Sequence, residues 1–340
     1  MLNATEASRL AAARAGDPDE FSGLTEPYRR ELQVHCYRML GSLQDAEDLV
    51  QETMLRAWRR FDTFEGRASV RAWLYRIATN ACLDALHKRP RRALPADSAP
   101  ASDPGRPPES PVSEPVWLEP FPDDLLAAPE EDPEARYTAR ESVTLAFLTA
   151  LQLLPPRQRA VLLMRDVLGW RASEVAGLLD LTIPAVNSAL HRARVTLALH
   201  YHAGAGAQTA PKDDENLRAL LERYVRAWEA ADVPGLLSLL KEEAAFAMPP
   251  SPSWYRGRDA IRVFLSAAIF TDGSRGRWRR VLVSANSQPA FAVYERGAGG
   301  SYQAFAIEVL TMDRNQIADV TTFINPALFS RFGLPDRLAD

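Results

Sequence analysis

Two neighbouring stretches of this chain carry opposite charge: 45-DAEDLVQE-52 is acidic, and 71-RAWLYRIATNACLDALHKRPRR-92 is basic and contains aromatic residues. In the first stretch Asp45, Asp48 and Glu52 are three or four residues apart, so a helix places their carboxylates on one side. In the second, arginine and lysine outnumber a single acid, which is typical of a surface that binds phosphate. The pattern predicts two helices, one with an acidic ridge and one with a cationic face. Taken alone, such charge runs are also typical of solvated helices.

The composition is that of a globular protein with two or three domains. The chain has 340 residues, of which 46% are hydrophobic and 25% charged, and its formal net charge is −4. Cys36 and Cys82 are its only cysteines, too few for a disulfide framework or a cysteine-rich zinc site, so we expect reduced core thiols and no metal or cofactor. We find neither a signal peptide nor an apolar run long enough to span a bilayer, and we therefore expect a cytoplasmic protein.

Proline marks the main division of the chain. Twelve of its 25 prolines lie between residues 90 and 133, among acids, serine and alanine. This composition predicts a linker over 93–133 without a core of its own, in which the hydrophobic run 116-VWLEPF-121 is a candidate docking segment. Small residues predict a second linker over 203–212. The expected domains are therefore 1–92, 134–202 and 213–340.

The first two domains are expected to be all-α, and the second to contain a helix-turn-helix. The helical patterns 172-ASEVAGLL-179 and 183-IPAVNSALHRARVTLAL-199 are joined by a three-residue turn that ends at Thr182, a candidate helix cap. The exposed side of the second helix suits a major groove, with polar residues toward bases and arginine toward phosphates. A plain helical hairpin fits the same pattern.

The last domain has a different pattern. Helices are expected at about 214–231, 235–240 and 258–268, followed by alternating segments at 277–285, 290–296, 302–311 and 317–324. These segments predict an α+β domain with an antiparallel sheet.

The order of these parts resembles a known family. The runs 45-DAEDLVQETMLRAWRRFDTFEG-66, 73-WLYRIATNACLDALHKRPRR-92, 153-LLPPRQRAVLLMRDVLGWRASEVAGLLDL-181 and 186-VNSALHRAR-194 are similar, in order and spacing, to the extracytoplasmic-function bacterial RNA polymerase sigma factors. The resemblance covers roughly residues 21–202. It implies that 1–92 is sigma region 2, which binds core polymerase and the promoter −10 element, and that 134–202 is region 4, which reads the −35 element. The implied partners are promoter DNA and the clamp helices and flap of core RNA polymerase.

The resemblance also implies the roles of individual residues. The residues implied to bind core polymerase are Asp45, Asp48, Leu49, Gln51 and Glu52. Those implied to open and read the −10 element are Phe64, Arg67, Ser69, Arg71, Arg76, Asn80, Asp84 and Lys88. Those implied to read the −35 element are Thr182, Ala185, Asn187, Ser188, His191, Arg192 and Arg194. Basic residues often follow Val186 in the family, but Asn187 and Ala189 stand here, which leaves the −35 preference open.

Residues 214–334 resemble the SnoaL-like branch of the NTF2-like fold, a cone of curved sheet wrapped by helices. The linker run 117-WLEP-120 is similar to a motif of sigma factors that carry such an extension. The fold hosts enzymes, binding modules and interaction domains. Aromatic residues could line a pocket inside the cone or simply fill its core: Trp228, Phe246, Trp254, Tyr255, Phe264, Trp278 and Phe305.

We do not expect this domain to be an enzyme. All five histidines precede residue 203, so no histidine-acid pair can form within it. The remaining candidate acids and phenol, Glu308, Asp313, Asp319 and Tyr302, also suit ordinary structural roles. We expect a sigma factor modulated in cis by its C-terminal domain, which contacts the sigma domains together with the Trp117 motif. The alternatives are a sigma factor fused to a ligand-binding or catalytic domain, and a ligand-sensing helix-turn-helix regulator that acts without polymerase.

Overall fold

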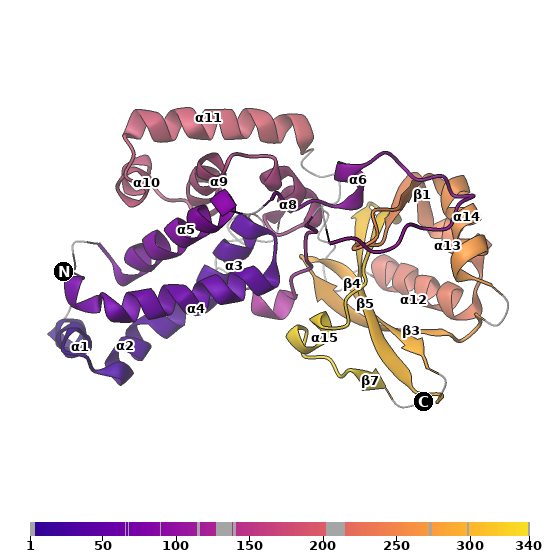
Figure 1. The fold of residues 1–340 in the computed structure, drawn as a ribbon, viewed down its shortest axis with the longest axis horizontal. Coiled ribbons are helices and arrows are strands. Elements are labelled where there is room, and N and C mark those ends of the chain that lie inside the picture. Colours follow the sequence, from indigo (N-terminus) through magenta and orange to yellow (C-terminus); the bar gives the residue numbers. More distant parts are fainter. Residues whose placement is uncertain are drawn as a thin grey trace. The chain divides into compact units, whose positions relative to one another are not determined.

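The computed structural model describes residues 4–64, 66, 68–88, 90–113, 116–126, 138, 141–201, 215–271, 274–297 and 299–338. The chain forms two compact units (Figure 1). Unit 1 consists of Met1–Arg91, Leu125–Ala139 and Ala150–His200. Unit 2 consists of Arg92–Asp124, Arg140–Thr149 and Tyr201–Asp340. Both predicted sigma regions therefore contribute to unit 1, whereas most of the predicted linker belongs to the same unit as the C-terminal domain.

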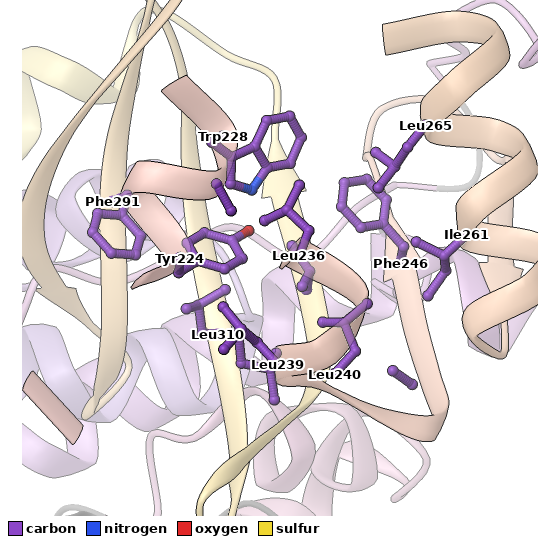
Figure 2. Close-up of a cluster of buried hydrophobic side chains, with 14 of the residues drawn as sticks. Tyr224, Trp228, Leu236, Leu239, Leu240, Phe246, Ile261, Leu265, Phe291 and Leu310 are labelled. Atoms are coloured by element: carbon purple, nitrogen blue, oxygen red, sulfur yellow. The ribbon is translucent and has the colours of Figure 1, made fainter. Parts of the chain in front are cut away.

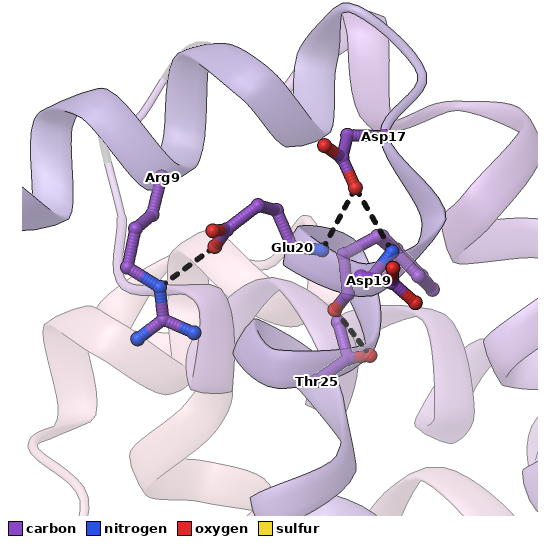
Figure 3. A network of polar contacts seen from close by, with 6 residues as sticks. Arg9, Asp17, Asp19, Glu20 and Thr25 are labelled. Atoms are coloured by element: carbon purple, nitrogen blue, oxygen red, sulfur yellow. Dashed lines mark hydrogen bonds and ion pairs between the residues drawn. The ribbon is translucent and has the colours of Figure 1, made fainter.

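The N-terminal part of unit 1 is helical, as predicted. Its elements are α1 (Ala4–Arg14), α2 (Pro18–Thr25), η1 (Glu26–Tyr28), α3 (Arg29–Leu40), α4 (Leu43–Arg59), η2 (Phe61–Thr63) and α5 (Val70–Lys88). Asp17 begins α2, because its carboxylate accepts the backbone N–H groups of Asp19 and Glu20 (Figure 3). The Glu20 carboxylate in turn lies 2.8 Å from Arg9 Nε of α1. These contacts join the first two helices.

Local sequence also explains the turn between α3 and α4. Gly41 ends α3 with a left-handed conformation, φ 70°, that glycine adopts without steric cost. The next residue, Ser42, begins α4 by accepting the Asp45 N–H with its hydroxyl. The two predicted core thiols, Cys36 of α3 and Cys82 of α5, are both fully buried. The helices α3, α4 and α5 share one core. The buried residues of α4 face this core, and its acidic ridge lies on the other side of the helix.

The second helical part contains the predicted helix-turn-helix. Its elements are α8 (Leu145–Gln152), α9 (Pro156–Leu162), the π-helical segment η4 (Leu163–Val167), α10 (Ala172–Leu179) and α11 (Ile183–His200). Asp180 ends α10 in a left-handed conformation, φ 53°, and the Thr182 hydroxyl accepts the Ala185 N–H to begin α11. Val175, Leu190 and other buried residues of these helices form their apolar side. The division between the two units falls within α8.

Unit 2 is built on one sheet. Its elements are α12 (Glu215–Ala230), α13 (Val233–Leu239), β1 (Leu240–Ala247), β2 (Trp254–Arg256), α14 (Arg258–Phe264), η5 (Leu265–Ile269), β3 (Trp278–Ala285), β4 (Gln288–Arg296), β5 (Tyr302–Asp313), β6 (Gln316–Phe323), α15 (Leu328–Arg331) and β7 (Arg337–Leu338). The strand order is β2-β1-β6-β5-β4-β3, and β7 pairs with β5. The sheet is mixed rather than purely antiparallel as expected, because β1 runs parallel to β6. The chain passes through four strands (β2, β3, β4 and β5) and through α14 between these two, so no hairpin constrains their direction.

One face of the sheet carries the main core. Tyr224 and Trp228 of α12, Leu236 of α13 and Ile261 of α14 pack in one cluster with the strands (Figure 2). A second cluster on other strand positions contains Tyr294, Phe323 and Phe329. Both faces are therefore covered by apolar packing, which explains the many buried residues in β4, β5 and β6.

Candidate functional site

The acidic ridge lies along α4. Asp48 and Gln51 are exposed, while Asp45, Leu49 and Glu52 are partly exposed. Glu52 pairs with Arg56 one helical turn further on, at 2.6 Å. Leu55, which is 49% exposed, adds apolar surface beside these groups. A row of carboxylates with an exposed leucine suits a protein partner better than nucleic acid.

The predicted −10 surface is formed mainly by α5. Arg76, Asn80, Asp84 and Lys88 are exposed along this helix, Ser69 is exposed just before it, and Arg71 is partly exposed. Arg67 lies outside the described residues. The helix therefore presents a mixed polar and cationic face of the kind that can contact bases and phosphates.

Phe64 differs from the expectation of a residue that reads DNA. It is only 5% exposed, because its ring packs between Phe61 and Trp73 at centroid distances of 5.6 and 5.2 Å. Phe21 joins the same cluster through Phe61. Phe64 thus belongs to an aromatic cluster with Phe61 and Trp73. The sequence did not distinguish this packing role from an exposed stacking role.

Two cations of α5 already have partners within unit 1. Arg71 donates to both carboxylate oxygens of Glu31 at 2.8–3.0 Å, and this hydrogen bonding raises the pKa of Arg71. The Arg76 guanidinium lies 3.0 Å from both carboxylate oxygens of Asp180, at the turn of the helix-turn-helix. The predicted −10 surface is therefore partly occupied by the chain itself.

The predicted −35 residues share one side of α11 and its N-terminal turn. Thr182, Asn187, Ser188, His191, Arg192 and Arg194 are exposed, and Ala185 is partly exposed. Arg194 makes two bonds to Asp166, at 2.7 and 2.9 Å, which raise its pKa. The helix offers polar side chains near its N-terminus and cations further along, as recognition helices do.

The aromatic residues predicted for the cone fall on two sides of the sheet. Trp228, Phe246, Tyr255, Phe264 and Trp278 belong to the main core, and Phe305 packs against it. Trp254 does not belong to that cluster, because neighbouring residues of β2 point to opposite faces. Its indole Nε1 instead donates to the linker carbonyl of Ala99 at 2.9 Å.

A buried ion pair that the sequence analysis missed lies in this core. Arg280 and Glu308 are joined at 3.0 Å, and their side chains are 3% and 1% exposed. Tyr224 and Thr322 donate their hydroxyl groups to the same carboxylate, each at 3.0 Å. The Arg280 guanidinium also lies 3.7 Å from the centre of the Trp228 ring. Because side chains alternate along a strand, Arg280 lies on the same side of β3 as Trp278. This spacing of two residues is the sequence signal that could have placed Arg280 in the core.

The other candidate groups have ordinary surroundings. Asp313 pairs with Lys241, and the Tyr302 hydroxyl donates to the Gly276 carbonyl at 2.8 Å. Burial raises the pKa of Asp319 to about 6, although Arg256 opposes this effect. Among the described residues, no group of histidine, cysteine or acidic side chains could hold a metal ion. None of the described helices has the length and apolar character that crossing a membrane requires.

The linker is packed rather than structureless where it is described. Trp117 is 9% exposed and Phe121 is 0% exposed. Ala93 pairs with Trp117 in a short parallel bridge, and the Ser102 N–H donates to the Trp254 carbonyl at 2.8 Å. The linker composition indicated that it has no core of its own, but its apolar residues use the core of the adjoining domain.

Asn286 joins the linker to the start of α8. The Asn286 side-chain oxygen accepts the Phe121 N–H at 2.9 Å, and its amide group donates to the Val143 carbonyl at 2.7 Å. The neighbouring Gln288 accepts the Leu145 N–H at 3.1 Å. Asn286 lies in the β3–β4 turn with φ 57°, a conformation that asparagine tolerates well. We call residues 285–288 the hairpin clip.

This arrangement defines a class of protein: two helical regions, the second a helix-turn-helix, and a cone-like α+β domain. The Sigma-70 region 2 family matches residues 24–92, the Sigma-70 region 4 family matches 144–197, and the SnoaL-like domain family matches 221–320. The ECF RNA polymerase sigma factor SigG of Mycobacterium tuberculosis is 47% identical over 334 residues, covering 96% of this chain and 86% of that protein. The chain therefore belongs to the extracytoplasmic-function RNA polymerase sigma factors.

Two further comparisons agree with this assignment. The ECF RNA polymerase sigma factor SigJ of Mycobacterium tuberculosis is 26% identical over 327 residues, covering 92% of this chain and 95% of that protein. The crystal structure of SigJ from the same organism matches the fold with a TM-score of 0.60 and 23% identity, over 94% of this chain and all of that one. The protein is a sigma factor, which directs core RNA polymerase to promoters and initiates transcription.

Proposed function

We propose that the C-terminal domain modulates the sigma factor in cis by holding both ends of the connection between regions 2 and 4. The observation that carries this proposal is the hairpin clip. It bonds Phe121, which follows region 2 along the chain, and Val143 and Leu145, which begin region 4. Because the clip belongs to the C-terminal domain, a change in this domain alters the path that the connection can take.

The surfaces that act on polymerase and promoter follow from the exposed residues. We assign core-polymerase docking to the acidic ridge of α4, −10 recognition to the exposed polar face of α5, and −35 recognition to α11. Phe64 is assigned a supporting role in place of a reading role, because of its burial. Such a factor works where RNA polymerase works, in the cytoplasm.

The C-terminal domain is proposed to be regulatory rather than catalytic. The buried carboxylate of Glu308 is paired with Arg280 and accepts two further hydroxyl bonds, an arrangement typical of a structural carboxylate. No histidine follows residue 202. The paired Glu308 and the missing histidine therefore favour a regulatory role over a catalytic one.

A second candidate role for this domain is binding a small ligand with hydrogen-bond acceptors. Arg280 Nη1, Trp278 Nε1 and the Tyr255 hydroxyl are buried without a hydrogen-bond partner among the described residues. Buried donors are normally satisfied, so an acceptor-bearing ligand would supply what they lack. A thermal shift of the full chain in a library of small carboxylates and ketones tests this alternative, and no shift would count against it.

In vitro transcription tests the cis-regulatory proposal. Core polymerase is combined with the full chain, with a chain ending at His202, and with the full-length Asn286→Asp variant, on a pool of genomic promoters. We expect both altered chains to change transcript yield in the same direction relative to the full chain. Equal yields from all three would overturn control in cis while leaving promoter recognition itself intact.

Polymerase docking is tested by charge reversal. The double variant Asp48→Arg with Glu52→Arg should lose core binding, because it replaces the exposed carboxylates of the ridge with cations. The matched control is Glu222→Arg with Glu229→Arg, which reverses two exposed acids on α12. Pull-down of core polymerase by each variant is the measurement. If the α4 variant binds as well as the control, the docking assignment is wrong.

A further inference from the structure

Polar contacts join α3 and α5 within region 2. At the start of α5, Arg71 donates to both carboxylate oxygens of Glu31 on α3, at 2.8–3.0 Å. About two turns further along α5, the Thr79 hydroxyl and the Nε2 atom of His35 on α3 are hydrogen bonded at 2.9 Å. We call these two contacts the α3–α5 seam. They hold α5 at two points that are about 12 Å apart, at about 1.5 Å per residue.

The contact between His35 and Thr79 is deeply buried. His35 is 1% exposed and Thr79 is 0% exposed. The His35 ring also packs against the buried Tyr75 ring of α5, with 5.0 Å between their centres. Burial lowers the pKa of His35 to about 3, so the imidazole is neutral near pH 7 and the hydrogen bond persists. A buried polar group that loses its partner is costly, so this contact favours one arrangement of the two helices.

The seam fixes the rotation of α5 about its axis. Thr79 directly precedes Asn80, so the direction of one side chain determines that of the other. The exposed row of α5, with members four residues apart, consists of Arg76, Asn80, Asp84 and Lys88. Apolar packing alone tolerates small shifts, whereas a hydrogen bond requires a narrow range of distance and angle. A rotation of about 20° moves a side-chain tip about 6 Å from the helix axis by roughly 2 Å, which is too much for a precise binding site.

We propose that His35 is a positioning residue for promoter recognition: with Thr79 it sets the rotation of α5, and so the orientation in which Asn80 and its neighbours meet the −10 element. This inference rests on the assignment of −10 recognition to the exposed face of α5. His35 is buried against α5, so it acts through the helix and not by touching DNA. The seam contributes to the choice of base rather than to core binding, which we assign to α4.

A double substitution removes the buried contact without leaving a polar group unpaired. His35→Leu with Thr79→Val replaces both partners by apolar side chains, which is much less costly than removing one of them. His35→Gln is the conservative variant, because its amide can still bond the Thr79 hydroxyl. The matched control is Thr53→Val. Thr53 of α4 is also fully buried, but its hydroxyl has no hydrogen-bond partner among the described residues.

Selectivity for the −10 element is the readout. Each full-length chain is combined with core polymerase and a set of promoters in which every −10 base is substituted in turn. We expect the double variant to bind core polymerase as the wild type does, and to lose roughly five- to ten-fold in discrimination between parent and substituted promoters. His35→Gln and Thr53→Val should keep wild-type discrimination. A merely destabilising change would lower the yield from all promoters by one factor and leave this ratio unchanged.

The variants separate the possible outcomes. Wild-type discrimination by the double variant would overturn the positioning role. A loss in His35→Gln or Thr53→Val as large as in the double variant would also overturn it, because the loss would then not depend on this hydrogen bond. Asn80→Ala tests the −10 assignment itself. If Asn80→Ala loses discrimination and the double variant does not, only the positioning role falls; if both keep it, the −10 assignment falls as well.

Discussion

Replacing Asn286 by aspartate should release the start of region 4 from the hairpin clip. Asn286 is fully buried, and aspartate has the same shape and also tolerates a left-handed backbone. The carboxylate still accepts the Phe121 N–H, which lies 2.9 Å away. It cannot donate to the Val143 carbonyl at 2.7 Å, so one bond of the clip becomes a repulsion between oxygens.

The magnitude follows from the lost bond and the group left behind. Leaving a buried hydrogen-bonding group without its partner costs about 1–3 kcal/mol, so segment 141–146 should be destabilised by about this amount. A loss of this size raises local opening by about 5- to 140-fold, at about 1.4 kcal/mol per factor of ten. The Leu145 amide, bonded to Gln288, reports this opening directly.

Hydrogen exchange with mass spectrometry, on full-length wild type and variant, measures the effect. Exchange over 141–146 should accelerate strongly, while exchange over the β5–β6 hairpin should not change. Asn315→Asp is the matched control, because Asn315 is an exposed turn residue of that other hairpin. Wild-type protection at Leu145 in the Asn286→Asp variant would refute the view that the clip holds region 4.

Three further predictions concern stability. Burial lowers the pKa of His35 from 6.5 to about 3. The free energy of unfolding should therefore fall by up to about 1.4 kcal/mol per pH unit as the pH drops below 6.5. The His35→Gln variant should lose this pH dependence, measured by urea titrations at pH 7, 6 and 5. The pKa of Asp319 is raised to about 6 in the folded chain from the ordinary value of 3.8, so its ionised carboxylate opposes folding above about pH 6. Asp319→Asn should therefore raise the free energy of unfolding by about 1–2 kcal/mol at pH 7.5 but not at pH 4. The Tm at the two pH values is the measurement. Arg280→Met leaves the Glu308 carboxylate buried without its cation, which should lower the free energy of unfolding by about 3–5 kcal/mol. Adding Glu308→Gln removes the uncompensated charge and should restore most of the lost Tm. If the double variant shows no recovery, the loss is not caused by an uncompensated charge.

Helical period and charge allowed much of unit 1 to be predicted. The carboxylates of the α4 ridge and the polar side of α11 lie on the faces that their spacing indicated. The helix-turn-helix begins and ends close to the predicted residues, because capping at Thr182 and the turn at Asp180 are local properties. Contacts between residues close in sequence leave a readable pattern.

Contacts between distant residues left no such pattern. Composition indicated a structureless linker, since its prolines and acids cannot build a core by themselves. Phe121 is nevertheless fully buried, because it bonds to Asn286, which is 165 residues further on. Trp254 and Tyr255 were likewise both candidates for the cone interior, because no strand was predicted there; in β2 these neighbouring residues point to opposite faces. In both cases the missing information was the partner surface.

The hairpin clip and the ion pair between Arg76 and Asp180 should respond differently to ionic strength, because the clip is buried and neutral whereas the pair is exposed and charged. The bonds of Asn286 lie in a site with no solvent exposure and carry no net charge, so ionic strength should not change them. The pair between Arg76 and Asp180 is exposed, and a Debye length of about 10 Å at 0.1 M salt falls to about 3 Å at 1 M. Added salt should therefore accelerate exchange around Asp180 in the wild-type chain while protection at Leu145 persists. A parallel loss of protection at both sites would mean that a single opening event, rather than two separate devices, governs the connection between the two regions.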